Sequence, residues 1–407
     1  MIKGLILADD LTGALDTGIQ FAKKYLSTMV VTEKNLDNIE ISNDVEILII
    51  DTETRHLNKE EAKLIIKKVI KLFKKIPTIK FFYKKIDSTF RGNIGSEIEA
   101  FMDELNIKDI PFIPAFPDNE RTIKNAKIYV HNIEITDTEF SKDRLNPIKD
   151  SYIPNILAEQ TNIKYKIENS YYFGKKLDKL IEIYDTTSNK DLENIFNKTF
   201  FEERINYFVG SAGFAGILAD KIGRGDNTCS MINTNYQLLV CGTVNNISLQ
   251  QCVYAEKIGY IPFKLKYENI IKNNYINTSN FCELKAEINK LLLSGKKILI
   301  KTEKSSCKSE QNKIQKISKI ISKNIALIVK DIVMENKLKG MIVFGGDTLI
   351  SIANELDCKS LLPISELLPG VVLTKLQCKE FDMFIVAKSG GFGNENVVEQ
   401  IIANNKI

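Results

Sequence analysis

Short apolar runs alternate with amphipathic stretches along most of the chain. In the first half the apolar runs cover residues 3–7, 46–50, 79–83, 109–115 and 207–210. The stretches between them that carry apolar residues at helical spacing are 12–26, 59–76, 96–105 and 213–222. Later apolar runs cover residues 237–241, 297–300, 341–344 and 384–387. Strands that are apolar on both faces are typical of a parallel sheet covered by helices, so the pattern predicts an α/β fold.

The chain has 407 residues, which is more than one compact core normally holds. Residues 223–235 are rich in Gly, Asn and Thr and lack apolar periodicity, and the α/β alternation restarts after them. We therefore predict two domains, residues 1–228 and 236–407, each with a mainly parallel sheet flanked by helices.

Composition excludes several classes of protein. The formal net charge is only +4, from 56 Lys and Arg against 52 Asp and Glu, which gives no reason to expect nucleic acid or a membrane as partner. The 7 Cys include no CxxC pair, so neither a disulfide framework nor a zinc site is expected. No apolar run reaches the length of a membrane span, and the N-terminus enters a predicted strand directly. A cytoplasmic protein is the expectation.

Three turns in the second half share one layout, in which an apolar strand is followed by small residues and then by a helix. They cover residues 242–246, 345–348 and 388–393. Glycine lets a ligand approach the backbone, and the N–H groups at a helix start attract phosphate. The chain has neither a GxxxxGK[ST] loop nor a GxGxxG fingerprint, so a Walker-type ATPase and an ordinary dinucleotide enzyme are disfavoured. Asp347 could either cap its helix or hold magnesium beside a phosphate chain.

Polar residues follow the strands of the first half. Asp9 and Asp10 come directly after the first strand, where they suit hydroxyl groups, a metal or a proton, although one of them could instead cap the next helix with Thr12. Residues 84–93 then combine charged, hydroxyl and amide side chains, among which Arg91 can grip a carboxylate bidentately.

Two further strand ends, at residues 51–55 and 114–122, are polar as well. Because the carboxyl ends of parallel strands meet at one edge of a sheet, four polar strand ends predict a pocket for a polar small molecule.

Several long motifs, taken in order, resemble those of the four-carbon acid sugar kinase family. They are ADDLTGALD at 8–16, KKIDSTFRGN at 84–93, PAFP at 114–117, DRLNP at 143–147, VGSAG at 209–213, GGDT at 345–348, PG at 369–370 and KSGGFG at 388–393. The resemblance covers nearly the whole chain. It implies that the N-terminal domain binds a sugar acid, that the C-terminal domain binds ATP, and that the reaction takes place in a cleft between them.

The resemblance also implies roles for individual residues. The residues expected at the reacting groups are Asp10, Asp87 and Arg91. Further expected contacts with the acid are Asp9, Arg55, Lys85, Ser88, Asn93 and Arg121. Those expected around the nucleotide are Thr243, Asn245, Gly345, Gly346, Asp347, Thr348, Gly370, Ser389, Gly390, Gly391 and Gly393, with Asp347 as the Mg²⁺ ligand.

Two positions depart from the pattern of the family. Glu120 stands where the family usually has glycine, beside the expected acid site. Asn245 stands where the family's first nucleotide turn usually has a second hydroxyl.

The function predicted on this basis is an ATP- and Mg²⁺-dependent kinase that phosphorylates a hydroxyl of a four-carbon sugar acid. In this hypothesis Arg91 fixes the substrate carboxylate, and either Asp10 or Asp87 orients the attacking hydroxyl. Two alternatives stay open, a sensor that binds sugar acid and nucleotide without catalysis and, less favoured, an NAD(P)-dependent oxidoreductase. The sequence leaves the choice among threonate, erythronate and 3-oxo-tetronate open, and also the oligomeric state, a homodimer included.

Overall fold

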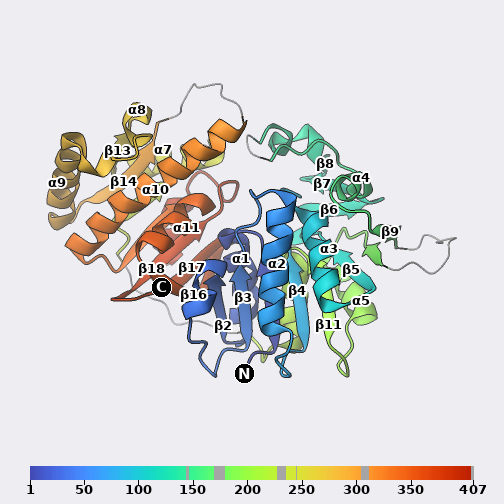
Figure 1. Ribbon diagram of the computed structural model, residues 1–407. Coiled ribbons are helices and arrows are strands. Elements are labelled where there is room, and N and C mark those ends of the chain that lie inside the picture. Colours follow the sequence, from blue (N-terminus) through green and yellow to red (C-terminus); the bar gives the residue numbers. More distant parts are fainter. Residues whose placement is uncertain (144–145, 169–178, 227–234, 244, 304–310, 405–407) are drawn as a thin grey trace. The chain divides into compact units, whose positions relative to one another are not determined.

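The computed structural model describes residues 1–143, 146–168, 179–226, 235–243, 245–303 and 311–404 (Figure 1). The chain divides into two compact units, Met1–Asn227 and Thr228–Ile407. Each unit contains a mainly parallel sheet with helices packed on it, which confirms the predicted α/β class. Of the residues discussed above, Arg144 and Leu145 of the DRLNP motif, Val244 of the first nucleotide turn and most of the 223–235 segment lie outside the described residues.

The sheet of the N-terminal unit is parallel. Its strands, in spatial order, are β2 (Thr28–Thr32), β3 (Ile47–Asp51), β1 (Gly4–Ala8), β4 (Phe81–Lys85), β11 (Asn206–Gly210), β5 (Asp109–Ile113), β10 (Leu180–Ile183) and β9 (Lys164–Ile167). A small antiparallel sheet stands apart from it, formed by β6 (Arg121–Lys124), β7 (Lys127–Val130) and β8 (Ile133–Glu134).

Helices cover the parallel sheet of this unit. They are α1 (Leu11–Ala22), α2 (Lys59–Phe73), α3 (Ile94–Leu105), α4 (Ile153–Ala158), α5 (Asn189–Thr199) and α6 (Ala212–Ile222). Short 3-10 turns lie at η1 (Glu33–Asn38), η2 (Pro117–Asn119), η3 (Ile135–Asp137) and η4 (Glu139–Lys142). Figure 1 shows α2 and α3 side by side in front of the sheet, and α1 packs beside α6.

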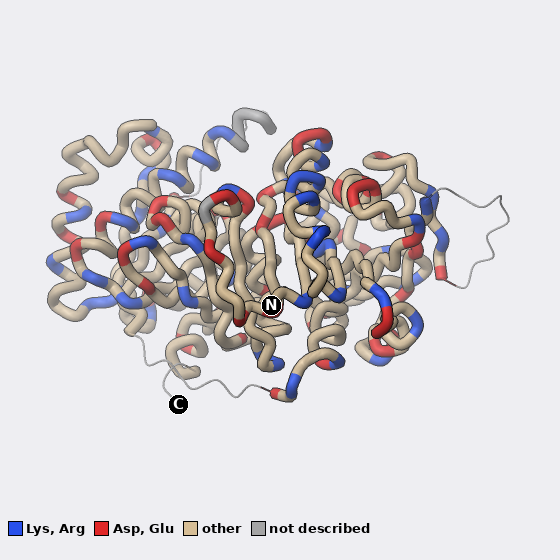
Figure 2. Tube along the Cα trace, turned by 60° about the horizontal axis from the view of Figure 1, so that its bottom comes forward, with Lys and Arg blue, Asp and Glu red and all other residues tan. Residues whose placement is uncertain are grey.

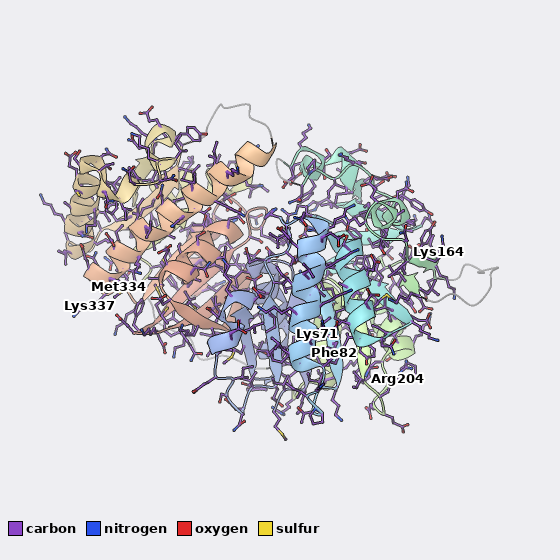
Figure 3. All side chains as sticks on the ribbon, in the orientation of Figure 1. Lys71, Phe82, Lys164, Arg204, Met334 and Lys337 are labelled. Atoms are coloured by element: carbon purple, nitrogen blue, oxygen red, sulfur yellow. The ribbon has the colours of Figure 1, made fainter. Side chains whose placement is uncertain are left out.

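Helix α2 shows how the sequence pattern produces this packing. One face of the helix is apolar and buried, and Asn58 caps its start by accepting a hydrogen bond from Glu61 N–H. The buried residues of this face recur at helical spacing and are Ala62, Ile66, Val69, Ile70 and Phe73. Lys71 lies on the opposite, solvent-facing side of the helix, whereas Phe82 of β4 is buried and stacks on Tyr207 (Figure 3). Each large apolar side chain buried in this way contributes roughly 1.5–3 kcal/mol of transfer free energy.

The order of the strands determines where a ligand can bind in the N-terminal unit. From β1 the chain passes through α1 to β2 and then to β3, both on one side of β1. It then crosses to β4, which pairs with the other side of β1. The loops after β1 and β4 therefore diverge at a switch point, which is where open parallel sheets bind ligands.

The C-terminal unit repeats this path and adds an antiparallel extension. Its strands, in spatial order, are β13 (Tyr260–Leu265), β14 (Lys297–Thr302), β12 (Leu238–Cys241), β15 (Gly340–Phe344), β18 (Asp382–Lys388), β17 (Val371–Cys378) and β16 (Cys358–Leu368). The first five are parallel, whereas β17 pairs antiparallel with both β18 and β16. Here the switch point lies between β12 and β15.

Helices of the C-terminal unit connect these strands. They are α7 (Asn246–Lys257), α8 (Tyr267–Ile270), α9 (Ser279–Leu293), α10 (Gln311–Asn336), α11 (Gly346–Glu355) and α12 (Val397–Asn404), with one 3-10 turn, η5 (Tyr275–Asn277). Helices α7, α11 and α12 each begin after one of the three glycine-containing turns. The hairpin of β16 and β17 was not predicted from the sequence.

Charged side chains of both signs are interspersed along the described chain, as Figure 2 shows. Within the described residues, no helix combines the length and the apolar character that a membrane span requires.

Lys84 and Glu97 form a fully buried ion pair inside the N-terminal unit. Lys84 on β4 and Glu97 on α3 are joined by a 2.6 Å contact between Nζ and Oε2, and their side chains are 0% and 2% exposed. Lys84 Nζ also donates to the carbonyl of Lys85 at 2.7 Å. The pair therefore connects helix α3 to the end of β4.

Removing only one partner of this pair should strongly destabilise the protein. We expect Lys84→Met to lower the free energy of unfolding by about 3–5 kcal/mol, because Glu97 would stay buried without its partner. The double variant Lys84→Met/Glu97→Leu should lose less than the sum of the two single variants. Urea denaturation followed by circular dichroism measures both effects. The control Lys80→Met, at an exposed position, should change stability by no more than about 0.5 kcal/mol; additive single losses would contradict the proposed coupling.

Candidate active site

Charged residues from three loops meet at the switch point of the N-terminal unit. Asp9 and Asp10 follow β1, Arg55 follows β3, and Asp87 and Arg91 follow β4. We call these five residues the acid–arginine cluster.

Arg55 joins the carboxylates of the cluster. Its Nε donates to Asp9 Oδ2 at 2.7 Å, and its Nη2 donates to Asp10 Oδ1 at 2.6 Å. The same Nη2 lies 3.8 Å from Asp87 Oδ1. Burial opposes the charge of Arg55, but the three carboxylates outweigh burial and raise the pKa of its guanidinium well above the ordinary value.

Asp87 and Arg91 form a two-pronged ion pair. Arg91 Nε donates to Asp87 Oδ2 at 2.6 Å, and Nη2 donates to Oδ1 at 3.1 Å. Thr89 Oγ1 also donates to Asp87 Oδ2, at 2.6 Å. Burial alone would raise the pKa of Asp87, but the Arg91 and Arg55 guanidiniums hold it well below the ordinary value. Asp87 is therefore ionised, and Arg91, predicted to grip a substrate, already grips a carboxylate of its own chain.

Asp10 has the capping role that the sequence left open, and it also lies in the acid–arginine cluster. It caps α1, because Oδ1 accepts from Gly13 N–H at 3.0 Å, while Oδ2 accepts from Thr12 Oγ1 at 2.5 Å. It also belongs to the cluster through Arg55. Burial opposes its charge, but Arg55 and Lys85 lower the pKa of Asp10 below the ordinary value.

Lys85, Ser88 and Asn93 lie nearby but differ in their contacts. Lys85 is buried, donates to the carbonyl of Ile86 at 2.9 Å and stabilises the Asp10 carboxylate. Ser88 is half-buried in the turn after β4. Asn93 donates both amide hydrogens to the loop after β3, to the carbonyls of Thr54 and Leu57 at 2.9 and 2.8 Å. Its observed contacts thus support that loop.

The side chains of Arg121 and Glu120 lie in different surroundings. Arg121 is buried, donates to the carbonyl of Asn119 and is within electrostatic range of Asp87 and Arg91. Glu120 is exposed, and its carboxylate pairs with His131 Nδ1. Its backbone has φ 55°, in the left-handed region that favours glycine. The side chain that replaces the family's usual glycine therefore contacts His131 rather than the acid–arginine cluster.

Two buried acids near the cluster were not among the predicted site residues. Asp51 ends β3, and burial, together with Glu53 and Asp10, raises its pKa well above the ordinary value. Glu97 pairs with Lys84, and burial raises its pKa as well, against the opposing effect of Lys84. Glu97 lies in the first turn of α3, which follows a polar strand end. This position is a signal in the sequence that could have marked Glu97 as a residue near the site.

The glycine-containing turns of the C-terminal unit pack closely against each other. A side chain at Gly242 would collide with Thr348 Oγ1, so only glycine allows the turns after β12 and β15 to approach this closely. Thr348 is buried at this contact. Gly345 N–H donates to the carbonyl of Lys388 at 3.1 Å, which joins the second turn to the third.

The predicted nucleotide contacts therefore form one group. Asn245 caps α7 by accepting from Ile247 N–H at 2.9 Å, and its own N–H donates to Thr243 Oγ1 at 3.2 Å. Gly390 lies beside both residues. Gly391 has open space where a side chain would be. The same turn group includes Gly346, Ser389 and Gly393.

Gly370 and Asp347 lie at the edges of this group. Gly370, with φ 71°, forms the turn between β16 and β17, and the ring of Phe392 occupies the space that a side chain at Gly370 would need. Asp347 is exposed in the first turn of α11, whose N-cap is Gly345 rather than Asp347. Among the described residues, no group of three or more His, Cys, Asp or Glu side chains is arranged to hold a metal ion.

Two family descriptions match the chain. Residues 4–218 match the sugar-binding N-terminal domain, and residues 238–398 match the nucleotide-binding C-terminal domain. The chain belongs to the four-carbon acid sugar kinase family.

Three relatives within this family align over almost their whole length. A D-threonate kinase of Salmonella typhimurium is 25% identical, covering 98% of this chain and 97% of its own. A D-erythronate kinase of Heliobacterium modesticaldum is 23% identical, covering 97% and 95%. A 3-oxo-tetronate kinase of Haemophilus influenzae is 23% identical, covering 97% and 98%. The similarity is thus spread over relatives with different named substrates.

Solved structures share the fold of this family member. A Salmonella typhimurium protein superposes with a TM-score of 0.78 at 18% identity, covering 98% of this chain and 99% of its own. A Haemophilus influenzae protein superposes with a TM-score of 0.71 at 21% identity, covering 98% and 100%.

The lowered pKa of Asp87 predicts how its contribution to stability depends on pH. That contribution is fully present above the ordinary Asp pKa of about 4 and is lost as the pH falls through the lowered folded-state pKa. We expect Asp87→Asn to lower the free energy of unfolding by about 3 kcal/mol at pH 7, with the difference from wild type shrinking below about pH 4. Urea denaturation across pH 3–7 tests this. Asp37→Asn, at an exposed position, is the control, and a difference that is constant over this range would refute the assignment.

Proposed function

We propose that this protein is an ATP- and Mg²⁺-dependent kinase that phosphorylates a hydroxyl group of a four-carbon sugar acid of the threonate, erythronate or 3-oxo-tetronate type. The observation that carries the proposal is the acid–arginine cluster at the switch point of a domain that matches sugar-binding domains. The full-length relatives named as kinases of such acids support it. A cytoplasmic location stays a prediction.

The N-terminal unit offers both kinds of group that a sugar acid needs. Cationic side chains would bind its carboxylate, and ionised carboxylates would accept hydrogen bonds from its hydroxyls. Arg91 presents Nη1, which lies 3.7 Å from Asp143 Oδ2, on a side chain that is 28% exposed. We propose that this edge of Arg91, together with Arg121, binds the substrate carboxylate.

Asp10 is the better candidate for orienting the attacking hydroxyl. The Arg91 guanidinium binds both oxygens of Asp87, whereas only Oδ1 of Asp10 accepts from a cation, and its Oδ2 accepts from the neutral hydroxyl of Thr12. The Asp10 side chain is also the more exposed of the two, 16% against 11%. Its lowered pKa makes it a weak base, which fits phosphoryl transfer because positioning and charge stabilisation contribute most to that reaction.

The C-terminal unit fits a nucleotide with bound magnesium. The open space beside Gly391 allows a phosphate to approach the backbone, and the half-buried Thr243 adds a hydroxyl. When bound, MgATP supplies the phosphoryl group and partly neutralises its charge. Phosphate oxygens would provide most of the magnesium ligands, as is usual for such sites, with Asp347 as the proposed protein ligand.

The proposal is tested by a coupled ADP-release assay with MgATP and a panel of D-threonate, D-erythronate and 3-oxo-tetronates. We expect ADP release that depends on one of these acids, at a turnover in the usual range of about 1–100 per second. Nucleotide binding without turnover on any acid would instead favour the sensor alternative. Absence of nucleotide binding would refute the proposal.

Asp10→Asn separates orientation of the substrate from folding. Asparagine caps helices as well as aspartate does, so α1 should stay intact. We expect kcat to fall by roughly 10²–10⁴, with a much smaller change in KM, because a positioned acceptor is lost in the transition state. Steady-state kinetics on the best acid measure this, and Asp118→Asn, at an exposed position, is the control. A kcat within threefold of wild type would remove Asp10 from this role.

A further inference from the structure

Lys388, at the end of β18, is a buried lysine that does not belong to the predicted nucleotide contacts. It is 1% exposed, and its Nζ lies 4.6 Å from the centre of the Phe344 ring. The ammonium donates to the carbonyls of Ser389 at 2.8 Å, Phe392 at 3.1 Å and Gly390 at 3.3 Å. The third turn therefore folds around a buried positive charge.

Gln251 on α7 binds the remainder of the same turn. Its Nε2 donates to the carbonyls of Phe392 at 3.0 Å, Gly393 at 2.9 Å and Asn394 at 3.0 Å. Three carbonyl partners fix the orientation of this amide, because the reversed amide would place oxygen against oxygen. Gln251 is completely buried, as is Ser248, whose Oγ donates to the carbonyl of Gly390 at 2.9 Å.

These inward carbonyls determine where the N–H groups of the turn point. The peptide bonds of the described chain are trans, and a trans peptide places its C=O and the following N–H on opposite sides. Carbonyls held inward at Ser389, Gly390, Phe392 and Gly393 therefore turn the next N–H outward in each case. The N–H groups so directed are those of Gly390, Gly391, Gly393 and Asn394. Several N–H groups on one side of a turn form an anion-binding concavity.

We propose that Lys388 and Gln251 are positioning residues for the phosphate chain of the nucleotide: they hold the carbonyls of the turn on one side so that its N–H groups face the phosphates on the other. The inference rests on the proposed nucleotide binding, and neither side chain contacts the nucleotide in it. The buried ammonium also polarises the peptides that it binds, which makes their outward N–H groups stronger partners for an anion.

Protonation of Lys388 links this arrangement to pH. Burial lowers the pKa of Lys388 to about 8, against the opposing effect of the thiols that face it, Cys241 on β12 and Cys252 on α7. As the pH rises through this value, the amine loses its charge and one donor. Affinity for a phosphate chain should therefore fall above about pH 8, and a bound nucleotide should raise the pKa of Lys388.

The test compares ADP with adenosine, which lacks phosphates, by isothermal titration calorimetry on the full-length protein. We expect Lys388→Met to weaken ADP binding by at least about tenfold, while adenosine binding changes less than about twofold. Gln251→Met should give the same selective loss, which keeps the test valid should Lys388→Met fail to fold. The matched control is Lys375→Met, which removes a partly exposed lysine from the neighbouring strand β17.

The pH profile gives a second, independent readout. Wild-type ADP affinity should decline above about pH 8, and this decline should be absent in Lys388→Met and retained in the Cys241→Ser/Cys252→Ser variant. Equal losses of affinity for ADP and adenosine, or unchanged ADP binding in both positioning variants, would refute the positioning role of Lys388 and Gln251. Neither result would contradict the proposed function. Wild-type protein that binds neither ADP nor ATP would instead refute the proposed function.

Discussion

Three carboxylates can lie together at the end of β1 and β4 because the Arg55 guanidinium lies among them. Burying Asp9, Asp10 and Asp87 without a cation would cost several kcal/mol for each charge. Arg55 binds the first two directly and lies 3.8 Å from the third, while Arg91 compensates Asp87 from the other side. Lys85 adds a third positive charge. The site is therefore ionised and nearly balanced before any substrate arrives, so a bound acid must share cations that already have partners.

In both units the same chain path brings together residues that are distant in the sequence. In each unit the chain starts at a central strand, β1 or β12, and the next two strands in sequence lie on one side of it. The strand after these, β4 or β15, pairs with the other side of the central strand, and this crossing creates the switch point. The N-terminal unit places charged side chains at this point, whereas the C-terminal unit places glycines and hydroxyls there. We propose that the same geometry serves recognition of hydroxyls and a carboxylate in one unit and of phosphates in the other.

The sequence predicted the parts of this structure that local patterns encode. Strands such as β1, β12 and β15 are continuous apolar runs, and their ends agree with the structure to within one residue. It did not predict the β16–β17 hairpin, in which Pro363 and three irregularities in pairing interrupt a simple alternation. The interactions between loops could not be predicted from the sequence either. The sequence correctly marked residues 84–93 as chemically dense, but whether Arg91 pairs with Asp87 and whether Asn93 holds the β3 loop depend on the packing of other elements.

The backbone at Glu120 has a consequence for how such chains diverge. Codons for glutamate and glycine differ by a single base, and a non-glycine residue in the left-handed region costs only about 1 kcal/mol. The Glu120 side chain is 61% exposed and contacts His131. A change between glutamate and glycine at this position therefore needs one base change, costs little stability and leaves the buried charges in place.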